Sequence, residues 1–248
     1  MEKKVALRKI EINNRIFDIS YEIINPSKKQ NIIFLHGWGS NKEIMKCFKN
    51  HFKDFRHIYI DMPGFGKSSN DYILKTKDYA KTINKLLSEL NISKDIIIGH
   101  SFGGKVATLL KPKLLVLLAS AGIVMPKPLN VKLKIKTYKL LKSLGLGKFR
   151  KYFVSGDAKG MSENMYETFK NVVDEDFSGY FAEYNGNVLI FGGKEDTAVP
   201  EKAIKKQAKF LRSKNIMLNG EHYFFFNSNE AEKNRKIIEN EVLKAWNV

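Results

Sequence analysis

The stretch that decides the fold of this chain is Asp95-Ile-Ile-Ile-Gly-His-Ser-Phe-Gly-Gly104. Its first half is a short apolar run, which is typical of a buried parallel strand, and residues 102–110 have the pattern of a helix. A Gly-x-Ser-x-Gly pattern between a strand and a helix is the setting of a nucleophile elbow. This sharp turn needs small flanking residues and pushes a serine hydroxyl above the sheet edge. Ser101 is therefore the predicted nucleophile.

Strand and helix patterns alternate on both sides of this stretch. Short apolar runs predict buried strands, and the segments between them predict helices with one apolar face. An N-terminal hairpin is expected over residues 5–24, with its turn at Asn13 and Asn14. The alternation predicts an α/β protein with a mostly parallel sheet and helices on both faces. The expected strands after the hairpin are 31–35, 57–60, 95–99, 114–118, 188–191 and 214–218, and the main expected helices are 76–90, 102–110, 201–211 and 229–246.

Residues 122–185 interrupt this alternation. They look mostly helical, contain several glycines and show no clear strand pattern. We therefore expect a helical cap at 122–185, inserted into a core domain formed by residues 1–121 and 186–248. Residues 131–151 within the cap are rich in lysine, a pattern that indicates either a solvated face or attraction to anionic partners.

A serine nucleophile needs a base and an acid that orients the base. In this architecture the acid follows the serine along the chain and the histidine comes last. Asp196 and His222 each follow an expected core strand, at the carboxyl ends where open α/β sheets place their sites. We predict the catalytic triad Ser101, Asp196 and His222. The competing acids are Glu195 and, with weaker claims, Asp174 and Asp176.

The other four histidines have weaker claims to the role of base. His51 and His57 are expected to be surface residues or satisfied by neighbours. His36 stands at the end of an expected strand and is expected to order the loop that follows. His100 lies inside the elbow, where its side chain is expected to point away from Ser101.

Acyl transfer also needs an oxyanion hole made of donors that are aimed in advance. One donor is expected to be the backbone N–H of Phe102, which directly follows the nucleophile. The second is expected from the loop after strand 31–35, which reads His36-Gly-Trp-Gly39. Trp38 is the predicted second donor, and the glycines on either side of it let the backbone turn close to a substrate.

Together, these motifs resemble the α/β-hydrolase superfamily. The resemblance implies an eight-stranded sheet, a cap over the site, no cofactor and no metal. It also implies a structural role for Asp61, and Ser101 argues against the superfamily's members that use an aspartate nucleophile. The motifs that carry the resemblance are His36-Gly-Trp-Gly39, Asp61-Met-Pro-Gly-Phe-Gly-Lys-Ser68, Gly99-His-Ser-Phe-Gly-Gly104, Asp196 with Val199-Pro200, and His222.

The residues of the first two motifs are most similar to those of small carboxylesterases and carbon–carbon-bond hydrolases of the superfamily. The expected function is hydrolysis of a carboxylic ester or thioester through an acyl-enzyme, on a small molecule with an apolar acyl group. One alternative is hydrolysis of a carbon–carbon bond in diketone-like acids. Another is a non-catalytic binding module with the same fold.

Composition and charge bear on the expected partners of the protein and on its location. The formal net charge is +17, but lysines are spread over most expected surface segments, which favours solvated faces over a nucleic-acid site. Cys47 is the single cysteine, so no internal disulfide can form and a reducing compartment is favoured. The N-terminal residues show no apolar leader, and the longest apolar run, 114–125, is shorter than the roughly 20 residues of a membrane span. We expect a cytoplasmic protein without stable membrane insertion.

Overall fold

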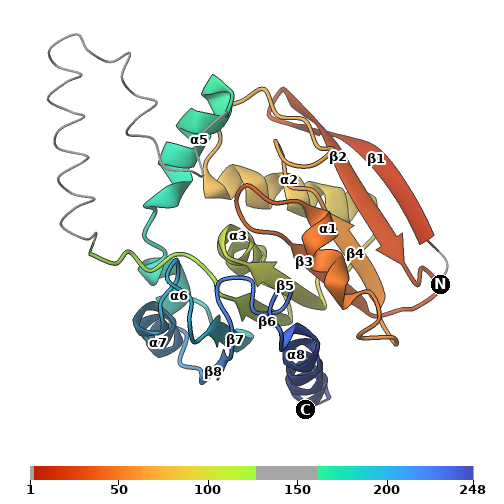
Figure 1. Ribbon diagram of the computed structural model, residues 1–248. Helices are drawn as coiled ribbons and strands as arrows, with labels where there is room; N and C mark the ends of the chain where they lie inside the picture. Colours follow the sequence, from red (N-terminus) through yellow and green to blue (C-terminus); the bar gives the residue numbers. More distant parts are fainter. Residues whose placement is uncertain (1–2, 127–160, 248) are drawn as a thin grey trace, which may run out of the picture.

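An eight-stranded sheet forms the centre of the structure, a computed structural model that describes residues 3–126 and 161–247. The strand order is β1-β2-β4-β3-β5-β6-β7-β8 (Figure 1). β2 is antiparallel to both of its neighbours, and all pairs from β4 to β8 are parallel. The strands are β1 (Lys3–Ile12), β2 (Arg15–Ile24), β3 (Asn31–Leu35), β4 (Arg56–Ile60), β5 (Ile96–His100), β6 (Leu114–Leu118), β7 (Asn187–Gly193) and β8 (Asn215–Leu218).

Helices cover both faces of this sheet, which confirms the predicted fold class. Every strand and main helix expected from the sequence is present, with small shifts of the ends. The helices are α1 (Lys42–Met45), the 3-10 helix η1 (Lys46–Phe48), α2 (Thr76–Glu89), α3 (Phe102–Leu110), α5 (Glu163–Val173), α6 (Ser178–Ala182), α7 (Glu201–Phe210) and α8 (Ala231–Trp246).

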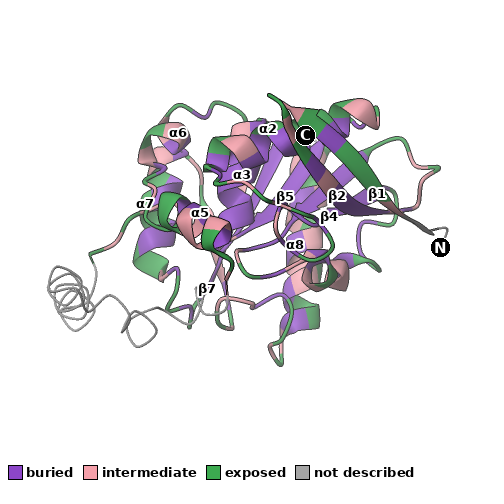
Figure 2. Ribbon diagram, turned by 90° about the horizontal axis from the view of Figure 1, so that it is seen from above, coloured by how far each residue is buried: buried purple, intermediate pink, exposed green. Residues whose placement is uncertain are grey.

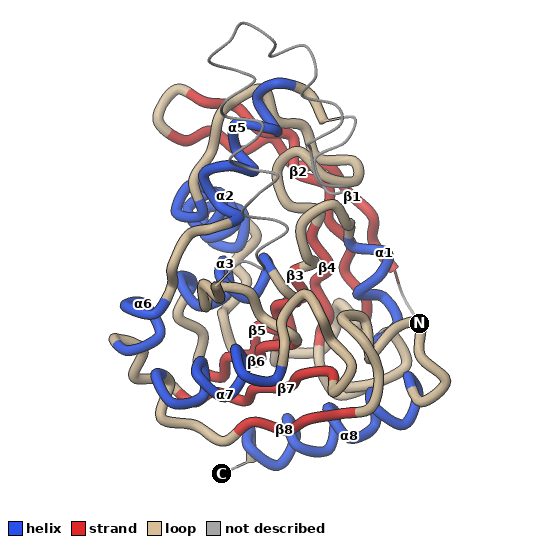
Figure 3. The backbone as a smooth tube through the Cα atoms, turned by 60° about the vertical axis from the view of Figure 1, so that its left-hand side comes forward, coloured by secondary structure: helices blue, strands red, loops and turns tan. Residues whose placement is uncertain are grey.

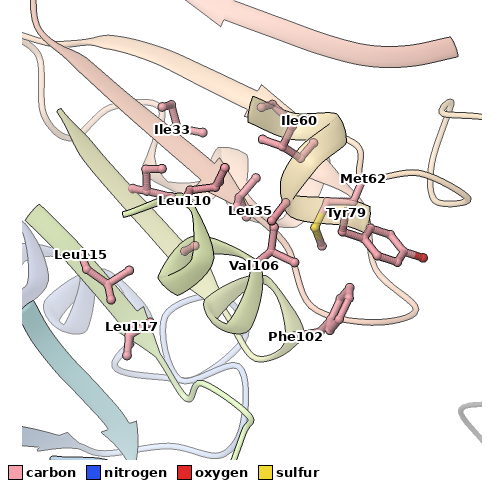
Figure 4. Packing of buried hydrophobic residues seen from close by; sticks show 14 of the residues in the cluster. Ile33, Leu35, Ile60, Met62, Tyr79, Phe102, Val106, Leu110, Leu115 and Leu117 are labelled. Carbon is pink, nitrogen blue, oxygen red and sulfur yellow. The ribbon is translucent and has the colours of Figure 1, made fainter. Parts of the chain in front are cut away.

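The central strands are buried on both faces, so their residues alternate between two apolar layers. In β3, Ile33 and Leu35 face the layer that includes α2, α3 and α7, while Ile32 and Phe34 face the layer of η1 and α8. Figure 4 shows the first layer, where Val106 and Leu110 of α3 lie against the strands. Burial on both faces explains why these strands read as continuous apolar runs in the sequence.

The N-terminal hairpin extends the sheet on one side. Asn13 and Asn14 both have positive φ values, 50° and 60°, as a two-residue hairpin turn of the primed type requires. β1 is an edge strand, and it carries exposed residues, shown in green in Figure 2, such as Leu7. The predicted turn is confirmed.

The order in which the chain adds strands to the sheet changes direction between β3 and β5. These two strands are neighbours, but the loop after β3 leads to α1 on one face, and the loop after β5 leads to α3 on the other. The carboxyl ends of such a pair leave a crevice where ligands bind in open α/β sheets. Both motifs that the sequence singled out, 36–39 and 99–104, begin at this crevice.

Two described helices, α5 and α6, stand between β6 and β7 in the chain, within the expected cap. α5 lies at the opposite end of the molecule from α8 (Figure 3). The basic segment 131–151 lies outside the described residues. The boundaries proposed for the cap and the core therefore remain predictions.

Candidate active site

Ser101 occupies a strained turn between β5 and α3. Its backbone has φ 50° and ψ −114°, a conformation that non-glycine residues rarely adopt. Neighbouring backbone stabilises the turn, because Ser101 N–H donates to Leu118 O at 3.0 Å and Ala121 N–H donates to Ser101 O at 3.1 Å. Strain that is held by the surrounding structure in this way is typical of functional sites. The elbow geometry expected from the sequence is present.

Two glycines allow the backbone to cross closely at this elbow. A Cβ atom on Gly99 would lie 2.5 Å from the carbonyl oxygen of Gly103. A Cβ atom on Gly103 would lie 2.5 Å from the carbonyl oxygens of Leu35 and His36. Real Cβ atoms do not approach backbone this closely, so α3 would have to move away from β3 and β5.

Replacing Gly103 with alanine is therefore expected to destabilise the whole fold, by about 1–3 kcal/mol or more, as overpacking of a filled core does. The measurement is the free energy of unfolding in urea. Gly179→Ala is the matched control, because a Cβ on this α6 residue meets no atom within 4 Å and alanine favours a helix. Equal stability of Gly103→Ala and the wild-type protein would contradict the close crossing.

His222 and Asp196 form a hydrogen-bonded pair after the last two strands of the sheet. His222 Nδ1 lies 2.8 Å from Asp196 Oδ2. The other carboxylate oxygen, Oδ1, accepts from the N–H groups of Ala198 and Val199, each at 2.8 Å. Asp196 is buried, whereas His222 is partly exposed. Because a carboxylate only accepts, Nδ1 of His222 carries the proton and Nε2 carries the lone pair.

Glu195, the competing acid, points elsewhere. Its Oε2 accepts from the backbone N–H of Gly220 and thereby holds the turn after β8. Asp176 accepts instead from the backbone N–H and the hydroxyl of Ser178. Of the acids considered, Asp196 is thus the one that contacts the histidine.

The side chain that links His222 to the elbow is His100, the residue before Ser101. Its Nε2 lies 3.1 Å from the carbonyl oxygen of His222, and the two imidazole rings are 4.7 Å apart between centroids. The structure therefore brings His222 and Asp196 to the carboxyl end of β5, where His222 contacts His100, the residue before Ser101 in the chain.

The loop after β3 lies against the same elbow. Among the described residues, the backbone N–H groups of Trp38 and Phe102 donate no hydrogen bond outside the helices and strands. The Trp38 ring contacts Phe102 edge-on, with 5.5 Å between centroids, and also contacts Phe169 of α5 at 5.4 Å. α5 thus packs directly on the predicted oxyanion loop.

His36 fixes the orientation of this loop, as the sequence predicted. Its Nδ1 lies 2.7 Å from Gly37 O, and the backbone N–H of Met62 donates to its Nε2 at 3.0 Å. The Gly37 carbonyl belongs to the same peptide unit as the Trp38 N–H, so the contact fixes the direction of both. Burial lowers the pKa of His36 to about 4, so the ring is neutral at neutral pH.

A buried ion pair with Lys42 holds Asp61, the residue before Met62. Lys42 Nζ lies 2.5 Å from Asp61 Oδ2, and the backbone N–H groups of Lys42 and Lys67 also donate to this carboxylate. Burial alone would raise the pKa of Asp61, but the hydrogen bonds from Lys42 and Lys67 outweigh it and hold the pKa below its usual value. The structural role implied for Asp61 fits these contacts.

Asp61→Asn is expected to lower the free energy of unfolding by about 3–5 kcal/mol at neutral pH, because it leaves the Lys42 ammonium buried without a counter-charge. A folded pKa below the unfolded value of about 3.9 stabilises the protein above that pH, and this contribution is lost as the pH falls through the folded pKa. The melting temperature of the wild type should therefore fall in acid more steeply than that of the variant.

Asp54→Asn is the matched control for this prediction. Asp54 pairs with Lys28 at 3.0 Å, but its side chain is 89% exposed, and exposed pairs contribute little to stability. A loss of stability that is equal in the two variants would contradict the importance of the buried pair.

His51 and His57 are not part of the site. His57 is buried and contacts Tyr59 Oη and Phe52 O, while His51 contacts Glu239. Both are satisfied by neighbours, as expected. Within residues 3–126 and 161–247, no cluster of three or more potential metal ligands occurs, and no helix of that part of the chain could cross a membrane.

Comparison with known proteins identifies the architecture. The family model described as the alpha/beta hydrolase fold matches residues 30–113. The esterase EaEST from Exiguobacterium antarcticum superposes with a TM-score of 0.72 at 18% identity, over 97% of this chain and 99% of that protein. The chain has the α/β-hydrolase fold. This is the fold that the motifs' resemblance implied.

Curated relatives match this chain over a shorter region. "Putative esterase/lipase 2" of Mycoplasma pneumoniae is 32% identical over 88 residues, which cover 33% of this chain and 32% of that protein. The pimeloyl-[acyl-carrier protein] methyl ester esterase of Wigglesworthia glossinidia brevipalpis is 35% identical over 82 residues, which cover 32% and 29%. The chain spans about a third of the length of these two relatives.

Two features of the structure were missed in the sequence. His100 contacts His222 across 122 residues, and nothing in its neighbourhood along the chain signals this. Lys105 is 1% exposed and donates to Val172 O at 2.7 Å, at the carboxyl end of α5. A lysine within the otherwise uncharged stretch 102–110 was the available signal. The expectation that lysines occupy surfaces is wrong for Lys42 and Lys105, because each has a buried oxygen partner.

Proposed function

We propose that this protein is a serine hydrolase that cleaves a carboxylic ester or thioester through an acyl-enzyme. The observation that carries the proposal is the 2.8 Å hydrogen bond between His222 and buried Asp196, beside the elbow that presents Ser101. A nucleophile, a base and an acid that orients the base are the parts that acyl transfer needs. The printed names of the relatives, esterase/lipase and methyl ester esterase, support ester chemistry.

In the proposed mechanism, Ser101 Oγ attacks the substrate carbonyl while His222 Nε2 takes its proton. Asp196 holds the ring in the required tautomer and stabilises the resulting cation. The tetrahedral oxyanion accepts hydrogen bonds from the N–H groups of Trp38 and Phe102. Collapse expels the alcohol or thiol, which His222 protonates, and water then attacks the acyl carbon with His222 again acting as base. The proposed chemistry uses only side chains and backbone groups of this chain.

A cavity of about 440 Å³ next to the elbow supports an apolar acyl group as substrate. It is lined mainly by apolar side chains from the segment after β6, from Val173 of α5 and from the loop after Asp196, together with the polar residues Asp174, Glu175 and Thr197. It also reaches Ala121, whose N–H donates to Ser101 O. Its volume is within the lower part of the range of ligand pockets, about 300–1,000 Å³. Lining side chains include Ala121, Ile123, Val124, Met125, Val173 and Val199.

The division into a core and a cap belongs to the same proposal. The core would be residues 1–121 and 186–248, and the cap would be residues 122–185. The placement of α5 and α6 between β6 and β7 supports it. So does the contact of Phe169 of α5 with Trp38 in the loop after β3. A cytoplasmic location, favoured by the single cysteine, is also part of the proposal.

The proposal is tested by measuring kcat/KM for a series of p-nitrophenyl esters from acetate to palmitate. A maximum at short to medium acyl chains is the expected result. A flat profile would contradict the apolar acyl pocket. Cleavage of a diketone-like acid, with no turnover of any ester, would replace ester hydrolysis by carbon–carbon-bond hydrolysis. Inactivity on both classes would favour the binding module.

A further inference from the structure

His100 is a buried imidazole with no assigned role, and it lies where three parts of the site meet. Its side chain is 1% exposed. Its Nε2 lies 3.1 Å from the carbonyl oxygen of His222. Since a carbonyl oxygen can only accept, the proton of the ring is on Nε2, and His100 donates to the main chain of His222.

The ring of His100 also packs against the loops on both sides. Its centroid is 4.7 Å from the His222 ring, 4.8 Å from Tyr223 and 5.0 Å from Phe225. On the other side, a Cβ atom on Gly37 would lie only 2.9 Å from His100 Nδ1. One side chain therefore contacts the loop of the histidine and the oxyanion loop, while its own backbone leads directly into Ser101.

The surroundings of His100 keep it neutral. Burial lowers its pKa well below the usual value, and the neighbouring His222 lowers it further. Among the described residues, its buried Nδ1 has no hydrogen-bond partner, so a second proton there would have no acceptor. His222 can therefore accept a proton without a positive charge beside it.

The hydrogen bond from His100 to the main chain of His222 matters because His222 lies in a turn-rich loop after β8, the edge strand of the sheet. Asp196 fixes the side chain of His222 through Nδ1. Glu195 and Asn234 hold the main chain on either side of His222, at Asn219, Gly220 and Phe224, but they do not contact the carbonyl group of His222 itself. The hydrogen bond from His100 restrains that main chain relative to the elbow. Misplacement of a catalytic group by about 1 Å can cost roughly 10²-fold in rate.

We propose that His100 is a positioning residue. The hydrogen bond from its Nε2–H to the carbonyl oxygen of His222 keeps the main chain of His222 at a fixed position relative to Ser101. This inference rests on the proposed function, since it assigns His100 a part in the same site. It adds a residue that acts through His222 and does not touch the substrate.

The test compares His100→Gln with His100→Leu. The glutamine amide can place an uncharged donor near the position of Nε2, whereas leucine has a similar size and no donor. With p-nitrophenyl butyrate, we expect kcat of His100→Leu to fall by about 10–100-fold with little change in KM. We expect His100→Gln to retain most of the wild-type kcat. Thermal melting of both variants shows whether each is folded.

A second readout needs no turnover. The proton shared by His222 Nδ1 and Asp196 gives a low-field proton resonance, which we expect in the wild type and in His100→Gln, and which should broaden or shift in His100→Leu. Wild-type kcat and an unchanged resonance in folded His100→Leu would overturn the inference, and so would equal loss in both variants. If the wild type hydrolyses no ester, the proposed function fails, and the resonance alone still decides the role of His100.

Discussion

Ser101→Ala is expected to reduce hydrolysis of a p-nitrophenyl ester by about 10⁶-fold, the scale of loss when the nucleophile of a serine triad is removed. The variant keeps His222, Asp196 and the oxyanion loop, but it has no oxygen that can form the acyl-enzyme. The measurement is kcat of purified wild-type and variant protein on the preferred ester of the chain-length series.

The Ser101→Ala variant should otherwise be intact. The Ser101 hydroxyl makes no hydrogen bond within the part of the chain that the structure describes, so its removal leaves no polar partner unsatisfied. The melting temperature is therefore expected to stay near that of the wild type. Ester turnover that survives in a folded variant would remove Ser101 from the mechanism.

Asp196→Asn is expected to lower kcat by about 10⁴-fold. The N–H groups of Ala198 and Val199 require an acceptor, so the asparagine oxygen will face them and its NH₂ group will face His222. The ring must then accept at Nδ1 and carry its proton on Nε2, where it cannot act as the base. The measurement is kcat at the pH optimum of the wild type.

Glu195→Gln is the matched control for this prediction. Glu195 is the neighbouring acid of Asp196, and its oxygen accepts from Gly220 N–H, a bond that glutamine can also make. We expect this variant to keep a rate near that of the wild type. A larger loss in Glu195→Gln than in Asp196→Asn would exchange the roles of the two acids.

The elbow could be predicted from the sequence because all of its requirements lie within ten consecutive residues. A buried strand, a serine between glycines and a following helix are each visible in residues 95–104. The sheet was predictable for a similar reason, since strands covered on both faces must be apolar throughout. The loops that carry Asp196 and His222 followed from chain order, because the carboxyl ends of parallel strands meet at one edge of the sheet.

Contacts that join distant segments could not be read in this way. The choice between Asp196 and Glu195 depends on which carboxylate faces His222, and that is set by the N–H groups of Ala198 and Val199. The donation from His100 to His222 depends on how closely β5 approaches the loop after β8. Neither the direction of a side chain nor such an approach has a local signature.

The buried lysines illustrate the same limit. Lys42 looks like any other lysine of a basic chain, yet it is buried because Asp61 comes to it from the loop after β4. Lys105 is buried because the carboxyl end of α5 and Glu175 supply oxygens around its ammonium group. In both cases the partner comes from another segment of the chain, and composition alone places the lysine on the surface.

Active-site labelling with a fluorophosphonate tests most directly whether Ser101 is an activated nucleophile. The reagent phosphonylates a serine that a neighbouring base activates, and intact-protein mass spectrometry followed by peptide mapping locates the added group. The account predicts one phosphonyl group per chain, on Ser101, in the wild type and none in Ser101→Ala. Labelling of another residue, or equal labelling of the wild type and Ser101→Ala, would contradict it.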